Sequence, residues 1–258
     1  EEFRKNCQKW GLTKDEYQDN GHFPRQVYVR EGRRIEGDHL FTGNDAVPVT
    51  GISRPPLFSN SITASHYAID SHAHHKREAG RAHLDGFLSF PTKPYTVPYG
   101  VIMPKKVEGL LTPVPVSATH LGFGTLRMEP CWMAMGQAAG VAASISIKEN
   151  KLPRNVDMLK LQQELVAQKA ILIYCKDVPP THASFAAVQF FGLRGLLPEW
   201  ELKLDAAVSE KDAQKWIAAC GVEKPADYKP GTTTRAELLN ALYQAVQKLP
   251  REKIDAIK

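Results

Sequence analysis

Three side chains able to bind a metal ion recur at every second position of one short segment: Asp70, His72 and His74. Because side chains alternate between the two faces of a β-strand, all three would share one face if the segment is extended. A carboxylate and two imidazoles on one face can hold a divalent cation, although this spacing fixes no fourth ligand. The same residues also suit a polar loop at the mouth of a site. The sequence leaves both interpretations open.

A second polar cluster precedes a segment rich in glycine and alanine. Ser117 and Thr119 supply hydroxyl groups, and Gly124 supplies backbone that a ligand can approach closely. We predict a loop here, followed by a helix over residues 127–147 with Pro130 in its first turn, where a missing N–H costs nothing. The positive end of such a helix favours a group that is, or becomes, negatively charged.

Small residues recur along this predicted helix at helical spacing. Gly136, Ala139, Gly140 and Ala143 would form a face with almost no side chain. Such a face lets a helix approach a sheet or a neighbouring helix closely. We therefore predict that it packs inside the protein.

Alternating patterns before the helix indicate strands. We predict strands over residues 61–70 and 96–103, and a further short strand over residues 110–116 that leaves its sheet early because it contains prolines. Residues 25–41 alternate in a way that predicts a hairpin turning at Glu31–Gly32. These elements would surround the two polar clusters.

Helical patterns dominate the remainder. Residues 157–170 form an amphipathic pattern whose predicted buried side is Leu159, Leu161, Leu165 and Val166. Residues 177–180 contain two prolines and predict a linker. Three short helices are predicted from Ser184 onward. The last begins at a capping box formed by Thr234 with Glu237, or by Thr232 and Thr233 in an adjacent register.

Composition excludes some classes of protein. The chain has 258 residues, 43% of them hydrophobic and 24% charged, which is enough for one or two packed domains. Its net charge of +5 is dispersed, with no basic stripe carrying interleaved aromatics, so nucleic-acid binding is not indicated. The sequence has no apolar run long enough for a membrane span and no paired cysteine motif. Localisation stays open.

Several ordered blocks carry a family resemblance. Residues 117–143 resemble the C-terminal flavin motif of bacterial FAD-dependent oxidoreductases related to the glutathione-reductase-like flavoproteins. The blocks that carry this resemblance are SATH, GFGTLRMEP and MAMGQAAGVAA. Three upstream segments are similar to that family's upstream blocks, in the same order: VYVREGRRIEGDHLFT, HYAIDSHAHH and YTVPYGVIMPKKVEGLL. The resemblance covers residues 23–173.

The resemblance implies an α/β fold, FAD as cofactor, a small organic substrate and an unidentified electron acceptor. It implies that His72 acts as an acid or base near the flavin, oriented by Asp70, because imidazole titrates near neutral pH. It also implies that Arg34 anchors a substrate carboxylate or the flavin, where an exposed, solvated arginine is the alternative. The implied cofactor contacts are Ser117, Thr119, His120, Gly124, Thr125, Leu126 and Arg127.

One expected part of an FAD site is absent from the sequence. Such proteins bind the ADP half of FAD with a G-x-G-x-x-G turn after the first strand, and no such turn occurs here. The resemblance therefore implies that the chain is the C-terminal part of a longer polypeptide, partnered by its own N-terminal half. By itself it is expected to bind FAD weakly or not at all.

Three regions follow from these inferences. Residues 1–106 are predicted to form a substrate-side β-rich region, and residues 107–176 the C-terminal strand and helix of a Rossmann-like FAD-binding domain. Residues 177–258 are predicted to form a small helical appendage, which weakly resembles a surface-layer homology module through its Thr-Arg-Ala-Glu segment. Two other functions stay open: a metal-dependent hydrolase using Asp70, His72 and His74, and a non-catalytic wall-anchoring protein.

Overall fold

The computed structural model describes Lys5 and residues 11–26, 30–72, 79–80 and 87–257. Its contacts divide the chain into two units, residues 1–32 and residues 33–258. The described part of the first unit contains one short 3-10 helix, η1 (Gln18–Asn20), and its residues are mostly exposed. Every candidate site residue lies in the second unit.

The described strands form two antiparallel pairs. β1 (Ser61–Ser65) pairs with β4 (Tyr95–Pro98), and β2 (Ile69–His72) pairs with β3 (Phe87–Phe90). β4 is buried along its whole length and leads into the 3-10 helix η3 (Tyr99–Ile102). Two isolated bridges, Gly37 with Pro104 and Phe41 with Ala118, attach the irregular segment before η2 (Gly43–Ala46) to this core.

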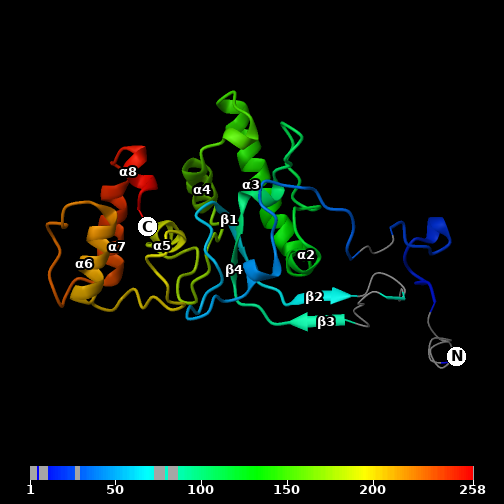
Figure 1. Cartoon of the computed structure of the whole chain (residues 1–258), viewed down its shortest axis with the longest axis horizontal. Coiled ribbons are helices and arrows are strands. Elements are labelled where there is room, and N and C mark those ends of the chain that lie inside the picture. The colour runs from blue at the N-terminus through cyan, green and yellow to red at the C-terminus, as the bar shows by residue number, and fades with distance from the viewer. Residues whose placement is uncertain (1–4, 6–10, 27–29, 73–78, 81–86, 258) are drawn as a thin grey trace. The chain divides into compact units, whose positions relative to one another are not determined.

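Two consecutive helices cross these strands. α2 (His120–Leu126) lies beside β2 and η2, and α3 (Glu129–Lys148) lies against β1 and α4 (Met158–Ala167), as Figure 1 shows. The 3-10 helix η4 (Pro153–Asn155) joins α3 to α4. Asp157 caps α4 by accepting hydrogen bonds from the Leu159 and Lys160 amides, and α4 buries Leu161 and Leu165 completely. This confirms the predicted amphipathic helix.

The C-terminal residues form four helices around a second apolar core. They are α5 (Phe185–Leu193), α6 (Glu210–Cys220), α7 (Arg235–Val246) and α8 (Arg251–Asp255). Phe191, Trp216 and Leu239 are among the fully enclosed side chains of this core. The predicted capping box is present: Thr234 accepts from the Glu237 amide, and the Glu237 carboxylate accepts from the Thr234 amide.

Two strand predictions are wrong. Residues 110–116 form no strand: Leu110 and Val114 are 43% and 45% exposed, and proline at positions 113 and 115 removes two ladder donors. The predicted hairpin over residues 25–41 does not form in its described part, residues 30–41. There the Ile35 amide donates to the Pro115 carbonyl at 2.9 Å instead, so this segment pairs with distant chain.

The other two predicted strands are shorter than expected. Residues 61–70 contain a break between β1 and β2, and residues 96–103 leave the strand after Pro98 to form η3. The expected loop over residues 117–125 is also partly helical, because α2 begins at His120, and the following helix begins at Glu129, not at residue 127. Pro130 does lie in the first turn of α3, as predicted.

The small-residue face of α3 packs only in part: Ala139 lies half-buried against the core, whereas its two glycines do not face other described atoms closely. A Cβ atom built on Gly136 or Gly140 would meet no described atom within 4 Å. The buried residues of α3 are Cys131, Met135, Ala138, Ala142, Ile145 and Ser146. These pack into the core and leave the two glycines at the surface of the described structure.

Candidate functional site

Helix α2 is pressed against two other backbone segments at its glycines. A Cβ atom on Gly122 would lie 2.3 Å from the Phe41 carbonyl oxygen, and one on Gly124 would lie 2.9 Å from the Asp70 carbonyl oxygen. No side chain fits at either distance. Both glycines therefore serve the packing of α2 onto β2 and onto the segment before η2, and Gly124 faces protein backbone.

A buried ion pair joins β2 to the residue that follows α2. The Arg127 guanidinium donates to the Asp70 carboxylate, and the two side chains are 4% and 19% exposed. The guanidinium also lies 5.8 Å from the centre of the Tyr67 ring. Charge-assisted hydrogen bonds of this kind are strong when they are desolvated. The pair holds the α2–α3 junction on the edge of β2.

A second polar contact lies at the other end of α2. His120, the first residue of the helix, is half-buried and forms a hydrogen bond through its Nε2 with the Ser71 hydroxyl. Thr119 caps α2, because its hydroxyl accepts from the Gly122 amide at 3.2 Å. The predicted cofactor residues Thr119 and His120 are thus placed together and remain partly accessible.

Two predicted cofactor residues are enclosed by protein. The Thr125 hydroxyl donates to the Tyr67 carbonyl, and the Tyr95 hydroxyl donates to the Thr125 carbonyl at 3.0 Å. Thr125 and Leu126 are both 0% exposed. Burial raises the pKa of the Tyr95 phenol, which keeps it neutral as a donor. The contacts described for these residues are structural.

Ser117 differs from every other predicted residue. It is 0% exposed, its amide donates to the Val101 carbonyl at 2.8 Å, and its carbonyl accepts from the Phe41 amide at 3.1 Å. Its hydroxyl oxygen has no hydrogen-bond partner within the described structure. Buried hydroxyls are nearly always satisfied, so this one requires an explanation.

Arg34, which is distant in the sequence, contacts the segment that contains Ser117 and Thr119. Its Nε donates to the Ala118 carbonyl at 3.1 Å, and its guanidinium lies 5.2 Å from the centre of the Phe123 ring. The residue is half-buried, so the structure does not leave it as a fully solvated hairpin arginine. Arg34, Ser117, Thr119 and His120 therefore belong to one neighbourhood.

The predicted acid–base residue is only partly described. The His72 backbone ends β2 opposite Phe87, while its side chain and the whole of His74 lie outside the described residues. The metal interpretation of Asp70, His72 and His74 stays a prediction for the same reason. No group of three His, Cys, Asp or Glu side chains suited to a metal occurs among the residues that are described.

One polar pair beside this neighbourhood was not predicted. Asp45 accepts from the Thr42 amide at 2.7 Å and contacts His39 Nε2 at 3.4 Å. Burial opposes ionisation of Asp45, but the hydrogen bonds from His39 and Thr42 outweigh it and lower the pKa of the carboxyl. The Thr-x-x-Asp spacing of a capping box was the available signal in the sequence.

The helix that follows the site begins without a side-chain cap. Met128 occupies the N-cap position of α3, and Glu129 and Pro130 in the first turn are exposed. α3 has 20 residues, so its amino end carries the full partial positive charge of a helix dipole. None of the helices formed by described residues is long and apolar enough to cross a membrane.

Comparison with known proteins identifies the family to which the chain belongs. Residues 1–165, more than half of the chain, match the family described as FAD dependent oxidoreductase. The match includes β1 to β4, α2, α3 and most of α4. No curated protein and no solved structure matches the chain significantly. The chain belongs to the FAD dependent oxidoreductase family, and its cofactor is FAD.

Proposed function

We propose that the enzyme transfers a hydride between an organic substrate and the flavin, whose ring end is held by residues 117–130. Bound FAD supplies the two-electron chemistry, and the protein supplies orientation and electrostatics. The amino end of α3 favours the extra negative charge that a flavin gains on reduction. Arg127 and Asp70 support this by holding the start of α3 against β2.

The residues present fit the ring end of the cofactor. The observation that carries this is the Ser117 hydroxyl, which is buried and has no partner in the described structure. A second is the uncapped amino end of α3, three residues beyond α2. The flavin's polar edge and ribityl chain offer hydrogen-bonding groups that suit both. The phosphates have no matching glycine-rich turn in this sequence.

Four further predicted residues receive a role in this proposal: Thr119, His120, Arg34 and His72. Thr119 and His120 form the border of the site on the side of α2, where both remain partly accessible. Arg34 binds a carboxylate of the substrate, because its guanidinium lies beside the same segment over Phe123. His72 exchanges a proton with the substrate, as the resemblance implies.

The division of the chain into regions is part of the proposal. We assign residues 1–106 to a substrate-side region, residues 107–176 to the end of a Rossmann-like domain, and residues 177–258 to a helical appendage. The separate apolar core of the C-terminal helices supports the last assignment. The glutathione-reductase-like ancestry, the fragment status and the surface-layer homology module stay predictions.

Two fully buried serines provide the test. Ser61 donates to the Thr63 and Leu172 carbonyls at 3.1 and 2.9 Å, whereas the Ser117 hydroxyl has no such partner. In the full-length protein, Ser117→Ala should weaken FAD binding about 5- to 10-fold while leaving the melting temperature unchanged. Ser61→Ala should lower the melting temperature and leave the affinity for FAD unchanged. Flavin absorbance during titration with FAD gives both affinities.

Two results would overturn the proposal. One is a full-length protein that purifies without colour and gains no flavin absorbance when FAD is added. The other is a Ser117→Ala variant that binds FAD as tightly as the unsubstituted protein does. That result would show that the Ser117 hydroxyl is not part of the cofactor site. Hydride transfer is tested separately, by a primary deuterium isotope effect on anaerobic flavin reduction once a substrate is found.

A further inference from the structure

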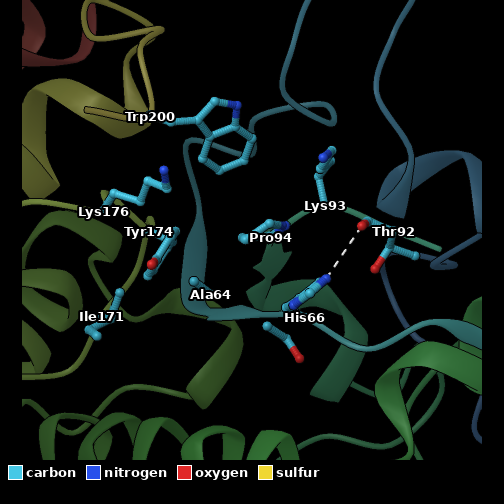
Figure 2. Close-up of a pocket in the computed structure, with 10 residues that line it drawn as sticks. Ala64, His66, Thr92, Lys93, Pro94, Ile171, Tyr174, Lys176 and Trp200 are labelled. Atoms are coloured by element: carbon cyan, nitrogen blue, oxygen red, sulfur yellow. Dashed lines mark hydrogen bonds between the residues drawn. The ribbon is translucent and has the colours of Figure 1, made fainter. Parts of the chain in front are cut away.

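A pocket of about 730 Å³ opens on the side of the β1–β4 pair, and no step of the proposed reaction uses it. Figure 2 shows the Trp200 ring at one side and His66 at the opposite side, with Tyr174 and Lys176 on one flank and Lys93 near the other. Its volume lies within the range of small-molecule sites. Most of the exposed lining is apolar, and aromatic rings form two of its walls.

A buried arginine fixes the aromatic walls. Arg54 is 2% exposed, and its guanidinium lies 3.9 Å from the centre of the Trp200 ring. It donates to the Pro198 carbonyl at 3.0 Å, the Tyr174 carbonyl at 2.9 Å and the Glu199 carbonyl at 2.5 Å. These bonds hold the backbone of both aromatic residues in place. The walls are therefore pre-organised, which lowers the entropy cost of binding.

The charged groups at the pocket are cationic. Lys176 and Lys93 both line it, and no acidic side chain does so among the described residues. Lys176 is paired with Glu201 at 2.8 Å, which reduces its contribution to the positive charge at the pocket. Lys93 is exposed and makes no ion pair with any described residue. His66 Nε2 lies 3.3 Å from the Thr92 carbonyl, which orients the ring at the floor. The available charge is thus the Lys93 ammonium.

We propose that this pocket binds a small organic anion with a planar ring, of the aromatic carboxylate class. The ring stacks on the face of Trp200 that points into the pocket, opposite Arg54, and the carboxylate pairs with Lys93. A cation behind the indole withdraws electron density from it and so strengthens stacking with an electron-rich ring. The proposal does not depend on the flavin chemistry above.

Titration calorimetry of the chain with 2-naphthoate tests the proposal, with 2-naphthamide as the neutral probe of the same shape. We expect 2-naphthoate to bind with a Kd below about 1 mM and the amide to bind at least about 3-fold more weakly. Trp200→Leu should weaken 2-naphthoate binding about 10-fold, and Trp200→Phe should retain most of it. Melting temperatures show whether each variant is folded.

The charge is tested without touching the aromatic walls. Lys93→Glu should weaken 2-naphthoate binding about 5-fold or more but leave 2-naphthamide binding unchanged. Lys224→Glu, an equal change of net charge outside the pocket, should alter neither affinity. Equal binding of the two probes, or indifference to both Lys93→Glu and Trp200→Leu, would overturn the proposal. Displacement of 2-naphthoate by FAD would also overturn it, because the pocket would then belong to the cofactor.

Discussion

Arg127 and Asp70 are separated by 57 positions in the sequence, yet their side chains form a largely buried ion pair at the junction of α2 and α3. The pair fixes where α3 begins relative to β2. The pair therefore attaches the short connection between α2 and α3 to β2.

Breaking this pair should destabilise the protein strongly. Arg127→Gln removes the buried guanidinium that donates to the Asp70 carboxylate, and we expect a loss of about 3 kcal/mol in the free energy of unfolding. The double variant Asp70→Asn/Arg127→Gln should lose less than the sum of the two single variants. Urea unfolding of the four proteins measures the coupling. Simple additivity would show that the pair contributes no interaction energy.

Alanine substitutions should have opposite effects on the glycines of α2 and α3. Gly122→Ala drives a methyl group into the Phe41 carbonyl and should prevent native packing of α2. Gly136→Ala meets open space within a helix and should stabilise the described structure by about 0.5–1 kcal/mol. Thermal unfolding compares them directly. A destabilised Gly136→Ala variant would mean that other residues cover this face of α3.

The capping carboxylate of Asp45 predicts a pH-dependent contribution to stability. Its pKa in the folded state is below the ordinary value of 3.8, so its contribution is present above that value and is lost as pH falls below it. Asp45→Asn should therefore cost about 1 kcal/mol near neutral pH and progressively less below about pH 3.8. Denaturant unfolding across this range measures it. A constant cost at every pH would exclude the ionised carboxylate as the cause.

The charge at the start of α3 should tune the flavin potential if FAD binds as proposed. Glu129 lies in the first turn and offsets the helix dipole. Removing its charge by Glu129→Gln should raise the two-electron reduction potential by about 10–20 mV. Glu164→Gln on α4 is the matched control. A potential unmoved by Glu129→Gln would place the flavin away from this helix end.

The sequence predicts elements well where the signal is local. α4 was found because apolar residues recur at helical spacing along residues 157–170, and α7 because a predicted capping box precedes an apolar run. The failures involve distant partners. Gly124 correctly indicated a close backbone approach, but nothing local says whether a ligand or the backbone of Asp70 makes that approach.

The site was predicted only in part, because it too depends on contacts between residues that are distant in the sequence. The segment from Ser117 to Arg127 was identified by its composition, but its contacts come from residues far away in the chain. Ser71 meets His120, and Arg34 meets Ala118, across separations of 49 and 84 positions. Such pairings depend on how the strands and α2 pack, which no pattern in the sequence specifies.

The hydrogen bonds of Arg54 affect how the protein unfolds. This one side chain joins the segment before β1 to the Tyr174 and Glu199 carbonyls, which flank the predicted linker at residues 177–180. Cleavage within that linker would leave the pieces attached through these bonds. We therefore expect the C-terminal helices to unfold cooperatively with the β1–β4 pair, in a single transition, and a nicked chain to migrate as one particle until it is denatured.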